Sequence, residues 1–437
     1  MDRRSFLQTT GIAGAWLLSA CGGQPKNVRR NTEAAKFTSR RAVIERAASG
    51  IPRYRQGEVT IQVNAPPEAF KFATLKITQT SNSFPLGCYL SFRGLPPERL
   101  NAYQEGFSRI FNYATVGGRL QVEPPDNLEE ALRLAKPEMD WAMAKEIHMC
   151  GNALIDGHKL RQAGAGGQTG WLRKTIQEGM ARYKGRISVW NVVCDPLAAD
   201  GSGGEQLADV IRQALEIARA QDSGAKLVIS QSGVMQQKST RRRPWLELVR
   251  TLGAAGAPFD AVGVQAINPR DEWPDPIDVG GVLDEFAALD RRIHISGFAA
   301  QANPDVQIAG GYRTGMWDRA KQADCLREFM TLCYGHSHVD AVTLAALDDG
   351  RCGVPDGALL ADNWQRKPAW NLLERMVSGE WRTISEVRPE VSTHRFHGFT
   401  GQYEVTATLG EGLRGSAKFT LHPGQNHEWV LNVERTT

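Results

Sequence analysis

Short apolar, β-branched runs recur eight times along this chain, and each ends in turn residues or in a polar residue. Stretches of helical period separate them, and the clearest are Pro137–Met149, Trp171–Tyr183, Gly204–Ala220, Val282–Leu289 and Trp317–Leu332. Near-continuous apolar strands that alternate with helices form a parallel sheet buried on both faces. Eight such units in about 300 residues predict an α/β fold, a closed (β/α)8 TIM barrel, at residues 84–378. The strands are expected at Leu86–Leu90, Ile110–Val116, Ala153–His158, Ser188–Asp195, Lys226–Gln231, Ala261–Ile267, Ile293–Phe298 and Ala341–Asp348.

The flanks of the predicted barrel follow a different pattern, in which apolar and polar residues alternate. This alternation is typical of antiparallel strands with one buried face. It predicts a small β-rich appendage, built from an N-terminal flank at 51–83 and a C-terminal region at 379–437. The alternating segments are Glu58–Val63, Thr74–Thr80, Gln402–Thr408, Ser416–Leu421 and Trp429–Val433.

The composition excludes several classes of protein. Hydrophobic residues make up 41% of the chain and charged residues 23%, which is ordinary for a globular protein and excludes a mostly disordered chain or a multi-span membrane protein. The net charge of +4 is too small to indicate a nucleic-acid partner. No Gly-x-Gly-x-x-Gly follows the first strand and no Cys-x-x-Cys occurs, so we expect neither a dinucleotide cofactor nor a thiolate metal site.

Residues 1–21 have the pattern of an export signal, in which a charged start precedes about a dozen apolar residues. Arg3-Arg4 with Phe6-Leu7 resembles the twin-arginine signal of bacteria. Leu18–Cys21 resembles a bacterial lipobox, which implies that Cys21 is lipidated, although a plain cleaved signal with an incidental cysteine is the alternative. We therefore expect a lipid-anchored protein of the bacterial cell envelope, at the outer membrane or cell surface, with a flexible tether at 22–50. In an oxidising compartment the other six cysteines could form disulfides.

A barrel of this kind carries its site at the C-terminal ends of the strands. Those positions are polar but poor in carboxylates. The fourth strand ends in Asp195, whereas the seventh, Ile293–Phe298, offers no acid. A retaining glycosidase needs two carboxylates about 5–5.5 Å apart across one sugar. The other polar positions at this end are His158, Cys194, Gln231, Gln265, Ser296, Asp348 and Asp349.

Several segments near the strand ends match a known family. Arg182–Gly185 followed by Trp190–Asp195 resembles the "RYKG…WDVVNE" segment of glycoside hydrolase family 10, the endo-β-1,4-xylanases. Gly157–Leu160 is similar to its "GHTL", Val262–Gln265 to its "IGLQ" and Lys367–Trp370 to its "KPAY". The matches follow the family's order from about Phe84 to Leu373. The resemblance implies the barrel independently, and a β-linked polysaccharide such as xylan as ligand.

The same resemblance implies that the catalytic residues are changed. The family's acid/base Glu falls on Asp195 and the Asn before it on Cys194, while its nucleophile Glu falls on Gly297. Its sugar-gripping residues after the second strand fall on Gly117–Val122, where all four are absent. An aspartate withdraws the carboxylate by one methylene, and a mispositioning of about 1 Å costs about 100-fold in rate. A glycine removes the covalent route altogether.

Two functions remain open at this stage. The first is a catalytically inactive barrel that binds polysaccharide or serves as a surface assembly component, with His158, Gln265, Asp349 and Cys194 as binding residues. The second is an active glycosidase that uses Asp195 as acid and a water-activating base such as Asp348 or Asp349, about 6.5–9.5 Å away. Aromatic residues in the cleft would favour sugar binding, whereas a mouth filled by its own side chains would favour a structural role. We expect a polysaccharide or envelope-protein partner, a membrane bound through the lipid, and no nucleic acid.

Overall fold

The computed structural model describes residues 26–117, 128–163, 169–204, 206–236, 238–267, 270–309, 312–424 and 427–435. The chain divides into two compact units, Met1–Ser39 and Arg40–Thr437, and the architecture below belongs to the second. The expected signal at 1–21 and its Cys21 lie outside the described residues, as do positions 118–122 of the sugar-gripping segment. Of the helices in the described ranges, none combines the length and apolarity needed to cross a membrane.

The predicted (β/α)8 barrel is confirmed. Eight parallel strands close into one ring in the order β10-β3-β4-β5-β6-β7-β8-β9, and pairing of Val342 with Leu86 completes the closure. Every residue of β3 and β4 is buried, as expected for strands covered on both faces. The strands are β3 Leu86–Tyr89, β4 Tyr113–Val116, β5 His148–Asp156, β6 Val189–Cys194, β7 Lys226–Gln231, β8 Ala261–Ala266, β9 Arg292–Phe298 and β10 Val339–Leu344.

Helices follow the barrel strands and bury their apolar faces against them. Leu207, Ile211 and Leu215 of α6, for example, recur at helical spacing and are buried. The helices are α2 Pro97–Ile110, α3 Leu128–Ala144, α4 Gly157–Ala163, α5 Thr169–Tyr183, α6 Leu207–Gln221, α7 Arg242–Ala254, α8 Pro276–Ala287, α9 Arg319–Tyr334 and α10 Pro368–Arg375. A π-helical turn, Met376–Glu380, continues α10.

Four of the expected elements have wrong boundaries. The expected strand Ile110–Val116 starts only at Tyr113, because Ile110 ends α2 on its buried face. The expected helix Pro137–Met149 and strand Ala153–His158 shift toward the N-terminus: α3 ends at Ala144, Glu146 takes a left-handed φ of 55° that breaks the helix, and β5 runs His148–Asp156. The eighth strand ends at Leu344, so Asp348 lies beyond it.

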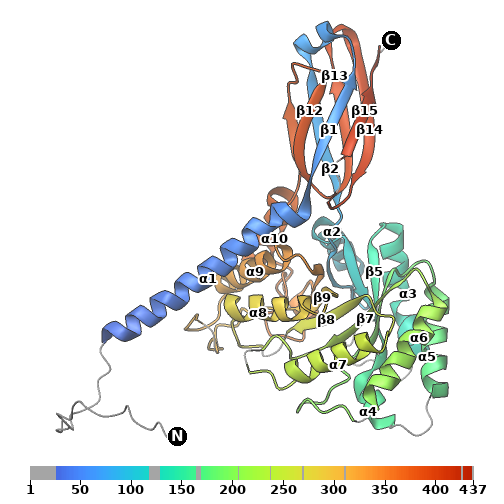
Figure 1. Ribbon diagram of the computed structural model, residues 1–437, viewed down its shortest axis with the longest axis vertical. Coiled ribbons are helices and arrows are strands. Elements are labelled where there is room, and N and C mark those ends of the chain that lie inside the picture. The colour runs from blue at the N-terminus through green and yellow to red at the C-terminus, as the bar shows by residue number, and fades with distance from the viewer. Residues whose placement is uncertain are drawn as a thin grey trace, which may run out of the picture. The chain divides into compact units, whose positions relative to one another are not determined.

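The expected β-rich appendage is a sandwich of two sheets. Strands from both ends of the chain share it: β1 pairs with β12 and β15, and β2 pairs with β11 and β13 (Figure 1). The alternating Val59, Ile61 and Val63 of β1 face its core. Its strands are β1 Gln56–Asn64, β2 Thr74–Asn82, β11 Ile384–Val387, β12 Thr393–Phe399, β13 Gly401–Thr408, β14 Leu413–Leu421, β15 His427–Asn432 and β16 Glu434–Arg435.

Most of the segment expected as a flexible tether at 22–50 is helical instead. Helix α1 spans Lys26–Arg55, and its second half is docked on the barrel unit. Arg40 forms a bidentate ion pair with Asp275, the N-cap of α8, and lies 4.4 Å from the centre of the Tyr312 ring. A Cβ on Gly50 would lie 2.2 Å from the carbonyl oxygen of Gly335, so only glycine permits this close approach.

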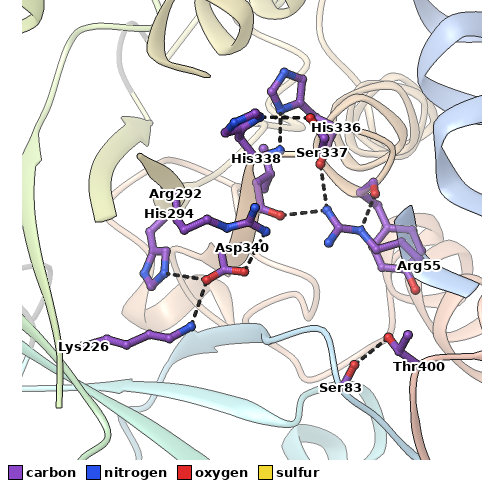
Figure 2. A network of polar contacts seen from close by, with 12 residues as sticks. Arg55, Ser83, Lys226, Arg292, His294, His336, Ser337, His338, Asp340 and Thr400 are labelled. Atoms are coloured by element: carbon purple, nitrogen blue, oxygen red, sulfur yellow. Dashed lines mark hydrogen bonds and ion pairs between the residues drawn. The ribbon is translucent and has the colours of Figure 1, made fainter. Parts of the chain in front are cut away.

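The amino ends of the barrel strands carry a network of charges, drawn in Figure 2. Asp340 accepts hydrogen bonds from Lys226 (2.9 Å) and Arg292 (3.1 Å), and His294 lies 3.9 Å away. Burial opposes ionisation, but His294 and Lys226 hold the pKa of Asp340 well below its usual range. Beside it, the buried Arg55 donates to three backbone carbonyls, those of Tyr334, His336 and Val339. At this end of the barrel, Asp340 and Arg55 are therefore partnered by the chain's own groups.

Candidate active site in the barrel mouth

A layer of polar side chains fills the barrel below its mouth. The six interior residues Tyr113, Cys150, Val189, Val228, Ala261 and Ala341 form one apolar layer of the barrel. Two residues further along a strand the side chain points to the same side, and five of these positions are polar: Thr115, Asn152, Asn191, Ser230 and Thr343. All five are buried, and we call them the polar interior layer.

Hydrogen bonds join this layer into a network. Asn191 Nδ2 donates to Ser230 Oγ at 2.7 Å and also to Asn152 Oδ1. Asn152 in turn donates to the hydroxyl of Tyr89, which donates to the carbonyl of Ser296. Burial raises the pKa of Tyr89 well above its usual range, so the hydroxyl keeps its proton. The barrel floor is thus a fixed neutral network, which sequence reasoning did not predict as part of the site.

Asp195 lies directly after β6, the fourth barrel strand, where the sequence predicts the acid. Its Oδ1 accepts hydrogen bonds from the backbone N–H of Ser232 (2.6 Å) and from Gln231 Nε2 (3.3 Å). Its carbonyl accepts from Arg161 at 2.7 Å, and its backbone has a left-handed φ of 55°. The carboxylate therefore ties β6 to the end of β7. Gln231, itself fully buried, completes the tie by accepting from the N–H of Leu197.

His158 does not lie at a strand end as expected. Strand β5 ends at Asp156, whose side chain accepts from the backbone N–H of His158, and His158 is exposed in the first turn of α4. The preceding Gly157 has a packing role, because a Cβ there would lie 1.9 Å from the carbonyl oxygen of Asp195. Cys194 ends β6 and is partly exposed. None of the six described cysteines forms a disulfide.

On the seventh barrel strand, β9, the space beside Gly297 is already occupied by neighbouring side chains. Gly297 is buried on β9 beside Gln265 of β8, which is half-buried. A Cβ built on Gly297 would lie 2.8 Å from Cδ1 of Ile267 and 3.4 Å from Cγ of Gln265. The backbone of Gly297 has no left-handed φ, so the glycine is required by space. Ile267 occupies the volume that any side chain at position 297 would enter.

Ile267 belongs to an apolar plug at the C-terminal ends of three strands. It follows β8, Ala299 follows β9 and Ala345 follows β10. Together with Val354 and the partly buried Cys352 they form a separate hydrophobic cluster, which we call the apolar plug. Ile267, Ala345 and Val354 are at most 4% exposed. The mouth is therefore filled by the chain's own side chains over its sixth to eighth strands.

The two acids after β10 are also engaged. Asp349 forms a buried ion pair with the fully buried Lys367 at 2.5 Å and accepts from the N–H of Ala358. Asp348 accepts from Arg351 at 3.1 Å, while its Oδ2 is buried without a partner. Burial raises the pKa of both Asp348 and Asp349. In the described part of the chain, no cluster of His, Cys, Asp and Glu is suited to holding a metal ion.

Sequence reasoning missed three participants that a closer look at the pattern would have indicated. Asn191 and Asn152 interrupt apolar strands at interior positions, and Lys367 stands before a buried helix. A polar side chain in such a place needs partners, so each one signals a buried contact. Ile267 carried no such signal, because an apolar residue after a strand is ordinary.

The comparison with protein families decides the identity of this fold. The family model for glycosyl hydrolase family 10 matches residues 80–376, which contain all eight barrel strands. The chain belongs to glycosyl hydrolase family 10. The order of motifs along the sequence predicted this family.

Curated relatives of this glycosyl hydrolase family 10 chain are xylanases. It is 24% identical over 372 residues to Endo-1,4-beta-xylanase C of Paenibacillus barcinonensis, covering 72% of this chain and 32% of that protein. It is 29% identical over 209 residues to Endo-1,4-beta-xylanase C of Phanerodontia chrysosporium, covering 44% and 49%. The chain thus spans a third to a half of the length of these relatives.

Solved family 10 structures share the fold. The family 10 protein of Paenibacillus barcinonensis superposes with a TM-score of 0.55 at 21% identity, covering 67% of this chain and 94% of that one. Xylanase 10B from Thermotoga petrophila, solved in complex with xylobiose, gives 0.55 at 17% identity, covering 68% and 95%. At these identities the likeness concerns the fold.

Proposed function

We propose that this protein is an exported, lipid-anchored family 10 barrel that has lost hydrolytic activity and binds polysaccharide or assembles at the cell surface. The observation that carries the proposal is the contact at position 297. Retaining hydrolysis needs a carboxylate that attacks the anomeric carbon. In this proposal Gly297 stands at the position of that group, which is supported by the contact that a Cβ there would make with Ile267 at 2.8 Å.

The second catalytic position supports the same proposal. An acid/base residue must reach the leaving oxygen within about 2.6–3.2 Å. Asp195 is one methylene shorter than the family's Glu, and its Oδ1 is engaged with Ser232 and Gln231. Through these contacts Asp195 holds the end of β6 to the end of β7.

Binding without turnover tests the proposal. We expect the protein lacking residues 1–21 to bind xylan or another β-linked polysaccharide measurably in affinity electrophoresis, and to bind about tenfold more weakly when Gln265 is changed to alanine. The matched control is Gln402→Ala on the exposed face of the sandwich, which should leave binding unchanged. An equal loss in both variants would place binding elsewhere, and no binding to any polysaccharide would leave surface assembly as the role.

An active inverting glycosidase is the second candidate, and one observation favours it. Asp348, a candidate water-activating base of that mechanism, has a buried carboxylate oxygen without a hydrogen-bond partner, and burial raises its pKa. Under this alternative, the anomeric configuration of the product would be inverted, as nuclear magnetic resonance would show. Asp348→Asn would then abolish turnover, whereas under the main proposal there is no turnover to abolish.

Export and anchoring depend on the sequence features of residues 1–21. We expect the mature chain to begin at Cys21 with a lipid attached, and mass spectrometry of protein from membranes to show it. Replacing Arg3 and Arg4 by lysine should block export if the twin-arginine resemblance is correct. An unmodified N-terminus downstream of Cys21 would contradict this part of the proposal.

A further inference from the structure

Helix α1 carries far more positive than negative charge. Its first half, Lys26–Ser39, contains the basic residues Lys26, Arg29, Arg30 and Lys36 and the single acidic residue Glu33. Its second half adds five arginines and only Glu45. The whole chain has a net charge of only +4, whereas this helix alone has nine basic and two acidic residues, so the helix accounts for the chain's net positive charge.

The arginines in the docked half of the helix, Arg40–Arg55, are of two kinds: some bind the barrel unit and others are exposed. Arg40 and Arg55 are used for docking, through Asp275 and through the backbone carbonyls near Tyr334. Three other arginines are exposed. The side chain of Arg41 is 74% exposed and that of Arg46 is 60% exposed, and each has one exposed acidic partner, Glu45 and Asp284. Such pairs contribute little to stability, and these arginines are accessible to a ligand.

A groove lies beside these exposed arginines. It has a volume of about 290 Å³ and lies between α1, α8 and the turn at Gly335–Ser337. Arg46, Arg53, Ser49 and His336 are among the residues that line it, and Asp284 is its one acid. Close approach of Gly50 to Gly335 keeps the helix in position along it. The groove has room and hydrogen-bond donors for the phosphate of a lipid headgroup.

We infer that α1 is a second membrane contact, which binds the anionic phospholipid surface beside the lipid anchor. This inference rests on the proposed anchoring at Cys21, five residues before the helix begins. Each Lys or Arg near an anionic surface changes partitioning about fivefold. The regularly spaced apolar residues of the helix, Val43, Ala47 and Ile51, pack on the barrel unit, so the attraction to a membrane is electrostatic and falls as salt screens it.

Vesicle sedimentation of the non-lipidated chain tests this contact separately from the anchor. The protein begins at residue 21 with Cys21→Ser, and the probes are vesicles of phosphatidylcholine alone or with about one third phosphatidylglycerol. We expect binding to the anionic vesicles only, with at least a tenfold loss between about 0.05 and 0.5 M salt. Because no lipid is attached, the result does not depend on whether Cys21 is modified in the cell.

Two variants with equal charge loss locate the contact. Changing Lys26, Arg29, Arg30 and Lys36 to glutamine should weaken binding at least tenfold. The matched control changes Lys71, Lys76, Arg414 and Lys418, all exposed on the sandwich, to glutamine, and should leave binding within about twofold. Equal losses in the two variants, equal binding to neutral vesicles, binding that survives high salt, or no binding at all would each overturn the inference.

Discussion

At both ends of the barrel the acidic residues are paired with basic side chains, although the two ends are expected to have different functions. At the amino ends of the strands, Asp340 is surrounded by Lys226, Arg292 and His294 (Figure 2). At the carboxyl ends, Asp349 is paired with Lys367 and Asp348 with Arg351. The amino end of such a barrel ordinarily serves stability and the carboxyl end serves chemistry. Here the carboxyl end has taken on a packing role as well.

Burial distinguishes the two ends further. Lys226 at the amino end is 55% exposed, whereas Lys367 at the mouth is completely buried. Solvent screens the first pair and leaves the second unscreened. Breaking a charge pair should therefore cost more at the mouth than at the amino end, the reverse of what an enzyme with an open active site would show.

The largest effect is expected for Asp349→Ala in the mouth. Loss of the carboxylate leaves the Lys367 ammonium buried without its counter-charge and should lower the free energy of unfolding by about 3–5 kcal/mol. Urea titration measures it. The double variant Asp349→Leu with Lys367→Met removes both charges and should recover most of the loss. A loss below about 1 kcal/mol in the single variant would show that the pair is solvated.

At the amino end, Asp340→Asn should cost about 2–3 kcal/mol at pH 7, because Lys226 and Arg292 lose their negatively charged partner. The contribution depends on pH in a defined direction. The folded-state pKa of Asp340 lies below the unfolded value of about 3.9. The stabilisation is therefore complete above that value and is lost as pH falls below it. Unfolding at pH 7, 5 and 3 should show the two proteins converging only at the lowest pH; a constant difference would contradict this account.

Position 297 tests how tightly the mouth is filled. Gly297→Ala should cost about 1–2 kcal/mol, because the new Cβ displaces Ile267. Ile267→Val removes the contacting Cδ1 and by itself should cost about 0.5–1.5 kcal/mol. The double variant should be more stable than the sum of the single effects predicts, as measured by a thermodynamic cycle. Strict additivity would mean that the two positions do not share this space.

The smallest effects are expected at Asp195. Asp195→Ala should lose about 1 kcal/mol, because Ser232 loses its acceptor and alanine is disfavoured at a φ of 55°. Asp195→Asn keeps both an acceptor and tolerance of this conformation, so its unfolding midpoint should stay near that of the wild type. An asparagine variant as unstable as the alanine one would show that the negative charge itself is needed.

The barrel could be predicted because its signal repeats. Eight apolar runs of strand length separated by helical periods leave few other topologies, and the alternating flanks predicted the sandwich strands. The boundaries around Ala153 were wrong because Gly151 and Asn152 interrupt the apolar run, although both are buried and Asn152 faces the barrel interior. Helix α1 was missed because most of its residues are polar, although Val43, Ala47 and Ile51 recur every four residues and are among its buried or half-buried positions.

The candidate site was only partly predictable. Its positions follow from the strand order, so Asp195, Gln265 and Gly297 lie at the mouth as expected. Whether the mouth is open or filled cannot be predicted from the strand order. The contact between Ile267 and position 297 depends on how β8 and β9 align, including a shift in their register near Gln265. His158 was misplaced because the strand before it ended two residues earlier.

The central claim, that this barrel has lost the family's hydrolytic chemistry, is tested most directly by turnover of an aryl β-xyloside and of xylan. The protein lacking residues 1–21 is compared with its Asp195→Ala variant at matched concentration. Because Gly297 supplies no nucleophile and Asp195 is held by Ser232 and Gln231, we predict no release of product above the uncatalysed rate from either protein. Turnover above about 1 s⁻¹ in the wild type, abolished in the variant, would contradict the account.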